Sequence, residues 1–299
     1  MHWDRRTTLI AVLVALLLLT VGIFASRDGN FGDTARLFPV RVNGKIGYID
    51  AKGKLAIQPQ FSNAGLFADG LAPVLAGDKW GYIDQSGKLT VQPQFEAADP
   101  FSDGLAVVGF NQKLGYVDRT GRFAINPQFE GAGRFEDGLA PVLVNGKWGF
   151  INKKGQWVIN PAFDEANSMS DGLALIRMGK SYGYIDKTGK IAINPQFESA
   201  GSFADGLALA RLGGKYGYID KKGAWAISPQ FDDAAEFSDG LAAVRVGNRF
   251  GYIDKKGKLV INPQFEDAGD FAGGLAPVWL GQNQGYINRE GRYVWNPTT

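Results

Sequence analysis

Short apolar runs alternate along this chain with glycine-rich reversals at a fixed spacing. A Gly-Tyr or Gly-Phe pair recurs every 34 residues, at Gly47, Gly81, Gly115, Gly149, Gly183, Gly217, Gly251 and Gly285. A leucine recurs at the same interval in another phase, from Leu37 to Leu275. Self-similarity with a period of about 20–50 residues indicates a repeat protein. The pattern therefore predicts eight copies of one unit, with no insertion between them.

The composition of the unit distinguishes strands from helices. A period of about 34 residues also occurs in helical tetratricopeptide arrays. From Gly44 onward, however, no stretch free of Gly and Pro exceeds ten residues. A glycine costs about 1 kcal/mol and a proline about 3 kcal/mol inside a helix. The prediction is therefore an all-β chain.

Each unit contains two reversals and three extended runs. The segment LAPVLAGDKWGYID divides into two strands around Gly77-Asp78, and Gly- or Asn-led pairs at this place suit the hairpin turns I′ and II′. An Asp-x-x-Gly or Asn-x-x-Gly sequence follows, which indicates a type I turn with a bulge. A third strand, such as residues 54–57, is expected to end at Pro59 because proline has no amide to donate. The unit is thus predicted to be a three-stranded meander.

The remaining residues of each unit link it to the next. We expect the aromatics at positions such as Phe61 and Phe67 to fill the space between neighbouring units, with Met169 replacing one of them. Proline in half of the first strands confines this strand to a sheet edge or to a face where its amide meets solvent, at Pro39, Pro73, Pro141 and Pro277. The predicted fold is a tandem repeat of eight meanders in a propeller-like ring, with an open β-superhelix or solenoid as the alternative.

The amino terminus carries a membrane signal. Residues 7–26 form an uncharged apolar run of about the length that crosses a bilayer. Arg5 and Arg6 precede it, which predicts a cytoplasmic amino terminus and an extracytoplasmic repeat domain. An uncleaved transmembrane anchor is favoured over a cleaved signal peptide, which would leave a secreted or periplasmic protein. The predicted organisation is an anchor or signal peptide at 1–26, a linker at 27–36 and a repeat domain at 37–299.

The second strand of each unit carries a recognisable motif. It reads KWGYID at 79–84 and KWGFIN at 147–152, and it is softened elsewhere to KIGYID, KLGYVD, KYGYID and RFGYID. With KLAIQPQF and FADGLAPV, this motif resembles the WG repeat family over residues 37–297. The resemblance implies a bacterial repeat domain, often exported or fused to other modules, that binds a partner. The last copy has Gln284 in the Trp position, which suggests a terminal cap.

Composition excludes several kinds of chemistry. Outside residues 1–26 the chain has 30 basic and 29 acidic residues, so it offers no overall field for nucleic acid. It has no cysteine, and its one histidine is His2. The recurring turn aspartates have Asn152 and Asn288 as equivalents, so we interpret them, like the Asp-Gly pairs, as turn formers. No enzyme activity, metal or cofactor is expected.

The residue type at the fifth position of the first strand differs between the eight units, and this variation suggests a binding site. This position holds Arg177, Arg211 and Arg245 in three consecutive units and Trp279 in the next. Such a row is the candidate ligand-binding site, suited to an anionic polymer or acidic peptide, and the alternative is an ordinary solvated surface. The expected function is a non-enzymatic, membrane-tethered extracytoplasmic binding or scaffold module for a protein or envelope glycan. A structural envelope spacer and a hydrolase remain alternatives.

Overall fold

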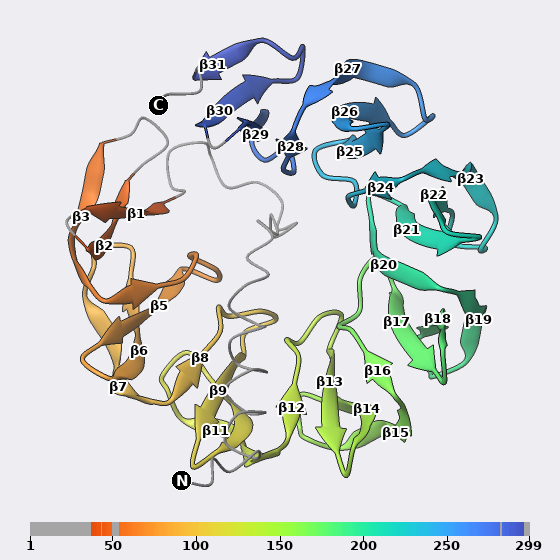
Figure 1. Cartoon of the computed structure of the whole chain (residues 1–299). Coiled ribbons are helices and arrows are strands. Elements are labelled where there is room, and N and C mark those ends of the chain that lie inside the picture. Colours follow the sequence, from red (N-terminus) through yellow and green to blue (C-terminus); the bar gives the residue numbers. More distant parts are fainter. Residues whose placement is uncertain (1–36, 43, 50–53, 282, 296–299) are drawn as a thin grey trace, which may run out of the picture. The chain divides into compact units, whose positions relative to one another are not determined.

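The computed structural model describes residues 37–42, 44–49, 54–281 and 283–295, and this part of the chain is all β. The predicted anchor and the linker at 27–36 lie outside these residues. Within the described ranges, no helix is long and apolar enough to cross a membrane. The chain divides into an N-terminal unit that ends at Ala162 and a C-terminal unit that begins at Phe163. In each unit, consecutive sheets lie side by side (Figure 1).

The sheets of the N-terminal unit follow one another in sequence. The first has three strands, β1 (Phe38–Val42), β2 (Lys45–Ile49) and β3 (Leu55–Phe61). The second has four, β4 (Asn63–Ala64), β5 (Leu71–Ala76), β6 (Lys79–Asp84) and β7 (Leu89–Phe95). The third contains β8 (Ala97–Ala98), β9 (Ala106–Phe110), β10 (Lys113–Val117) and β11 (Phe123–Phe129). The fourth contains β12 (Gly131–Ala132), β13 (Leu139–Val144), β14 (Lys147–Asn152) and β15 (Trp157–Phe163).

The C-terminal unit repeats the four-stranded arrangement. Its first sheet contains β16 (Glu165–Ala166), β17 (Leu173–Met178), β18 (Ser181–Asp186) and β19 (Ile191–Phe197). Its second contains β20 (Ser199–Ala204), β21 (Leu207–Leu212), β22 (Lys215–Ile219) and β23 (Trp225–Phe231). Its third contains β24 (Asp233–Ala234), β25 (Leu241–Val246), β26 (Arg249–Asp254) and β27 (Leu259–Phe265). Its last contains β28 (Asp267–Ala268), β29 (Leu275–Leu280), β30 (Asn283–Asn288) and β31 (Tyr293–Trp295).

The predicted three-stranded meander is wrong for seven of the eight sheets, because the linker supplies a fourth strand. Asn63 pairs with Leu75 and Ala64 with Val74. The amide of Gly65 donates to the carbonyl oxygen of Pro73 at 2.9 Å. The backbone of the linker thus forms hydrogen bonds with the first strand of the next 34-residue repeat, as buried backbone groups require. The first strand therefore lies inside its sheet and not at an edge, and Pro73 takes part through its carbonyl group.

The third strand also differs from the prediction, because it continues past its proline. β3 extends from Leu55 through Pro59 to Phe61. Its register with β2 shifts between Tyr48↔Ile57 and Ile46↔Phe61, which places Pro59 in a bulge. A bulged residue is left out of the ladder, so the missing amide of proline costs no hydrogen bond there.

In both units the core lies between adjacent sheets. The prediction that aromatic side chains of the linkers fill this space is confirmed. Tyr252 of β26 and Phe271 of the following linker are both fully buried, with ring centroids 4.8 Å apart. The Tyr252 hydroxyl donates to the carbonyl oxygen of Gly269 at 2.8 Å, so its polar end is satisfied. Val278 and Ile287 of the last sheet complete this cluster. Met169 is fully buried in the corresponding linker position.

Both predicted turn types are confirmed. Gly213 and Gly214 have φ of 60° and 77°, as a type I′ hairpin requires, whereas Gly247, with φ of 63°, is the left-handed residue that opens its turn. In the second reversal, the amide of Gly223 donates to the Asp220 carbonyl oxygen at 2.9 Å. The Asp220 side chain accepts amide hydrogen bonds from within the same turn. Asn152 and Asn288 do the same, which confirms the turn interpretation of this position.

Candidate functional site

The hairpins between first and second strands form one end of the C-terminal unit, here named the hairpin face. It comprises the turns that follow β17, β21, β25 and β29 together with the first-strand residues leading into them. Carboxylates from the start of the linkers hold these turns. Asp164 accepts a hydrogen bond from the Gly179 amide at 2.6 Å, Glu198 from Gly213 at 2.9 Å, and Glu266 from Gly281 at 2.8 Å.

The structure places the predicted arginine row on this face, at one register position in successive sheets. The row comprises Arg177 on β17, Arg211 on β21 and Arg245 on β25, with Trp279 on β29. Each row residue lies between a residue of the short strand and a residue of the second strand. The neighbours are Glu165 and Tyr182, then Ser199 and Tyr216, then Asp233 and Phe250, and finally Asp267 and Gln284.

Arg177 forms the tightest ion pair of the row. Its Nη2 lies 2.7 Å from Glu165 Oε1, and its Nη1 donates to the Gly179 carbonyl oxygen at 2.6 Å. The Tyr182 hydroxyl donates to the other oxygen of Glu165 at 2.8 Å. Burial, followed by the hydrogen bond to Glu165, raises the pKa of Tyr182. Arg177, Glu165 and Tyr182 thus form one connected polar group.

The other two arginines are held more loosely. Arg211 Nε lies 3.9 Å from Glu198 Oε2, and its guanidinium carbon lies 5.6 Å from the centre of the Tyr216 ring. Arg245 Nη2 lies 3.9 Å from Asp233 Oδ2. The row therefore presents guanidinium groups that already have carboxylate partners within the unit. That it binds an anionic ligand stays a prediction.

The three arginines share an unfavourable feature. Among the residues that the structure describes, the Nε atoms of Arg177, Arg211 and Arg245 are buried without a hydrogen-bond partner. A buried donor without a partner costs about 1–3 kcal/mol. The same position in the N-terminal unit holds Arg41, Leu75, Gly109 and Leu143, and the two leucines pair with Trp80 and Trp148. An apolar pair thus occupies this register position elsewhere in the same chain.

Sequence reasoning missed an apolar row beside the arginines. Met178, Leu212, Val246 and Leu280 occupy the last position of the first strand, where they are 45%, 41%, 47% and 39% exposed. Phe110 and Val144 are half-buried at this position in the N-terminal unit. The signal was present in the sequence, because all four side chains are large and aliphatic in consecutive units.

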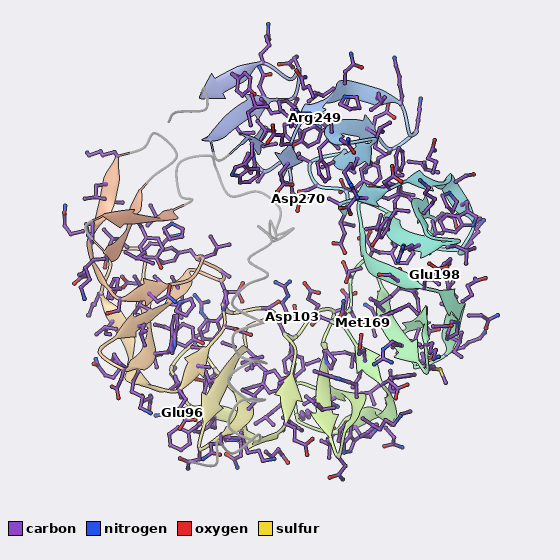
Figure 2. The ribbon with its side chains drawn as sticks, viewed as in Figure 1. Glu96, Asp103, Met169, Glu198, Arg249 and Asp270 are labelled. Atoms are coloured by element: carbon purple, nitrogen blue, oxygen red, sulfur yellow. The ribbon has the colours of Figure 1, made fainter. Side chains whose placement is uncertain are left out.

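Half-buried carboxyl groups lie near the short strands. Burial raises the pKa of Asp99 to about 6, and Arg134 opposes this shift. Burial also raises the pKa of Glu236, which accepts a hydrogen bond from the Ser202 amide at 2.9 Å. Figure 2 shows Asp270, which closely follows the short strand β28. Within the described ranges, no group of three or more His, Cys, Asp or Glu side chains has an arrangement that could hold a metal ion.

Fold and site together define a β-repeat protein that presents serial copies of one surface. The profile described as "WG containing repeat" matches seven times, at residues 46–80, 80–113, 115–148, 148–181, 182–216, 216–250 and 250–281. The chain therefore belongs to the WG repeat family, as its motifs predict. No curated protein matches its sequence.

Solved structures similar to this chain are distant in sequence. One is described as the crystal structure of the eukaryotic initiation factor; it is 12% identical, has a TM-score of 0.59, and the match covers 89% of this chain and 85% of that chain. Another is dihydro-heme d1 dehydrogenase NirN in complex with DHE, 14% identical with a TM-score of 0.56, covering 92% and 76%. Identities this low show the fold alone, which is all β with propeller-like neighbours.

Proposed function

We propose that this chain is a non-enzymatic binding or scaffold module that receives a protein partner on the hairpin face of its C-terminal unit. The observation that carries the proposal is the exposed aliphatic row of Met178, Leu212, Val246 and Leu280. Single exposed apolar residues need no explanation, but an apolar group repeated over four adjacent sheets is typical of an interaction site.

The residues around the aliphatic row have the composition of a protein interface. Arg, Tyr, Trp, Phe and Met are enriched in such interfaces, and Trp, Tyr and Arg also dominate the residues whose truncation weakens binding most. The hairpin face supplies Met178, the three arginines, Tyr182, Tyr216 and Trp279. Its charged side chains would fix the register of the partner. A repeated surface of this kind suits an extended partner segment that crosses several sheets.

A pair of charge-introducing variants tests the proposed surface. Leu212→Glu with Val246→Glu places charges in the aliphatic row, and we expect the full chain to lose its partner because buried charges oppose association. The matched control is Ile191→Glu with Leu259→Glu, whose side chains are 41% and 39% exposed on the third strands. Partner capture from the native membrane fraction, quantified by mass spectrometry, compares them. Equal capture by both double variants would refute the proposed surface, and recovery of glycan alone would replace the protein partner by an envelope polymer.

The proposed location is extracytoplasmic, with the chain tethered to the membrane. The support is the sequence of residues 7–26 and the two arginines before it. A tether would keep the hairpin face within reach of partners in the cell envelope. Resistance of the full chain to alkaline carbonate extraction is expected for a tethered protein, whereas a cleaved protein would be released.

We also propose the ring arrangement predicted from the repeat over the open superhelix. The support is the propeller-like character of the similar solved structures. A compact body of about 260 residues has a radius of gyration of ~18 Å. Small-angle X-ray scattering of the detergent-solubilised chain, with the detergent contrast-matched, is expected to give a value close to this. A clearly larger radius would favour the superhelix.

A further inference from the structure

The end of the C-terminal unit opposite the hairpin face has a different surface, here named the loop face. It comprises the Asp-Gly loops of the linkers and the Asp-x-x-Gly turns between second and third strands. Side chains join the two kinds of segment across repeats. Lys255 Nζ donates to the carbonyl oxygen of Asp205 at 3.0 Å, and Lys221 Nζ lies 4.0 Å from Asp171 Oδ2.

The loop carboxylates are set back from solvent. Asp171 accepts a hydrogen bond from the Gly206 amide at 2.8 Å, and Asp205 accepts one from Gly240 at 3.2 Å, so each loop is tied to the next. The Asp171 side chain is 12% exposed and that of Asp205 is 26% exposed. The lysines that pair with them, Lys221 and Lys255, are 48% and 44% exposed. The positive members of these pairs therefore project further than the negative ones.

The carboxylates of the Asp-x-x-Gly turns also accept hydrogen bonds from backbone amides. Asp254 Oδ1 accepts hydrogen bonds from the amides of Lys256 and Lys258, both at 2.9 Å, and Asp220 similarly binds the amides of Lys222 and Ala224. Both aspartates are half-buried, whereas the lysine side chains are exposed. In the C-terminal unit as described, the ammonium groups of Lys222, Lys256 and Lys258 take part in no ion pair within 4 Å.

The balance of charge on the loop face is positive. The four turns at 186–190, 220–224, 254–258 and 288–292 contain nine basic and four acidic residues. The Asp-Gly loops add the carboxylates of Asp171, Asp205 and Asp239. The aspartates of these loops and turns accept hydrogen bonds from backbone amides and lie deeper, whereas Glu290 is exposed beside Arg292. In the turns at 186–190, 220–224 and 254–258 the outermost charged groups are therefore ammonium groups.

We propose that the loop face of the C-terminal unit docks on an anionic bilayer surface. Lysine is a point charge on a flexible stem and does not favour one bidentate geometry. Such groups on the tips of separate turns match the many spaced charges of lipid headgroups. Each lysine near an anionic membrane surface increases the constant for membrane binding by roughly five-fold, and salt screens this effect.

This inference adds to the proposed tether, because docking would orient the unit with its hairpin face directed away from the membrane. The ten residues between 27 and 36 reach at most about 35 Å when fully extended. A tethered domain therefore stays near headgroups, which raises their effective concentration. Carbonate extraction reports on the tether alone, so its failure is distinguishable from failure of docking.

Lysine labelling of the full chain in vesicles tests the docking. A membrane-impermeant amine reagent is applied to the protein in phosphatidylcholine vesicles and in vesicles that also contain phosphatidylglycerol, on the side where the domain lies. We expect Lys190, Lys222, Lys256 and Lys258 to be labelled about five-fold or more slowly in the anionic vesicles. Lys180 on the hairpin face is the internal control and should react equally in both. The protection should disappear in about 1 M salt, where the Debye length is about 3 Å.

A charge-reversal variant separates docking from other causes of protection. Lys222→Glu with Lys256→Glu changes exposed side chains, and circular dichroism checks that the fold is kept. The variant should lose the protection of Lys190 and Lys258 in anionic vesicles. Equal labelling of the wild-type chain in both kinds of vesicle would overturn the proposal, as would protection of Lys180 to the same extent. Protection by soluble polyphosphate but not by anionic vesicles would show a polyanion site and overturn docking on a bilayer.

Discussion

Replacing Gly217 by alanine is expected to lower the free energy of unfolding of the C-terminal unit by about 3 kcal/mol. A β-carbon at this position would lie 2.5 Å from the Ile227 carbonyl oxygen and 2.7 Å from the Pro229 nitrogen. Both atoms belong to the backbone of the bulged third strand, so no side-chain rotation can relieve the contact. The glycine of the Trp-Gly motif is therefore required by the bulge that the proline occupies.

Urea unfolding followed by circular dichroism measures this effect, and Gly213→Ala is the matched control. Gly213 has φ of 60°, and a β-carbon there meets nothing within 4 Å. Its substitution should cost only the roughly 1–2 kcal/mol of left-handed backbone strain. If the two variants were equally stable, close packing against the bulge would not be the reason for glycine at position 217.

Turn chemistry made much of the fold predictable from sequence. Gly213-Gly214 and the Asp220-x-x-Gly223 turn act over four residues or fewer, so their conformations follow from local residue preferences. The bulge and the short strand were not predictable in this way. Pro59 indicates a strand end when it is considered alone, yet it is accommodated because Gly47 leaves room for a bulged partner strand. The residue type of Ala64 does not indicate a strand. Ala64 pairs with Val74 because the first strand of the next repeat has backbone groups available for hydrogen bonding.

Local residue preferences do not report contacts between repeats, which also explains which features of the candidate site were predicted from the sequence and which were not. The arginine row follows from the repeat register, because equivalent positions in equivalent units lie on equivalent sheets. The ion pair of Arg177 depends on Glu165, which belongs to a segment interpreted as a linker. Only the added short strand brings this carboxylate beside the arginine. The exposure of Leu212 likewise depends on packing between sheets, which the periodicity of one strand does not report.

Replacing Arg211 and Arg245 by leucine is expected to weaken partner binding by about 100-fold while leaving the unit as stable as before or up to about 1 kcal/mol more stable. The loss of affinity follows if the arginines contact the partner, since buried interface arginines often contribute more than about 1 kcal/mol each. The stability should not fall, because leucine removes two buried Nε donors that form no hydrogen bond with any described residue. The ion pairs lost are long, at 3.9 Å, and their side chains are 38–49% exposed, so solvent screening leaves them little value.

Arg177→Leu is the contrasting variant for stability. Arg177 bonds Glu165 at 2.7 Å and the Gly179 carbonyl oxygen at 2.6 Å, so its removal should bring no gain in stability. Urea unfolding and titration of the captured partner measure the two quantities on the same proteins. Leu75 and Leu143 show that the repeat accepts leucine at this position. A chain that becomes more stable and binds less would show that the arginines are kept for recognition at some cost to the fold. A parallel loss of stability and binding would instead make the row a structural element and contradict its role in binding.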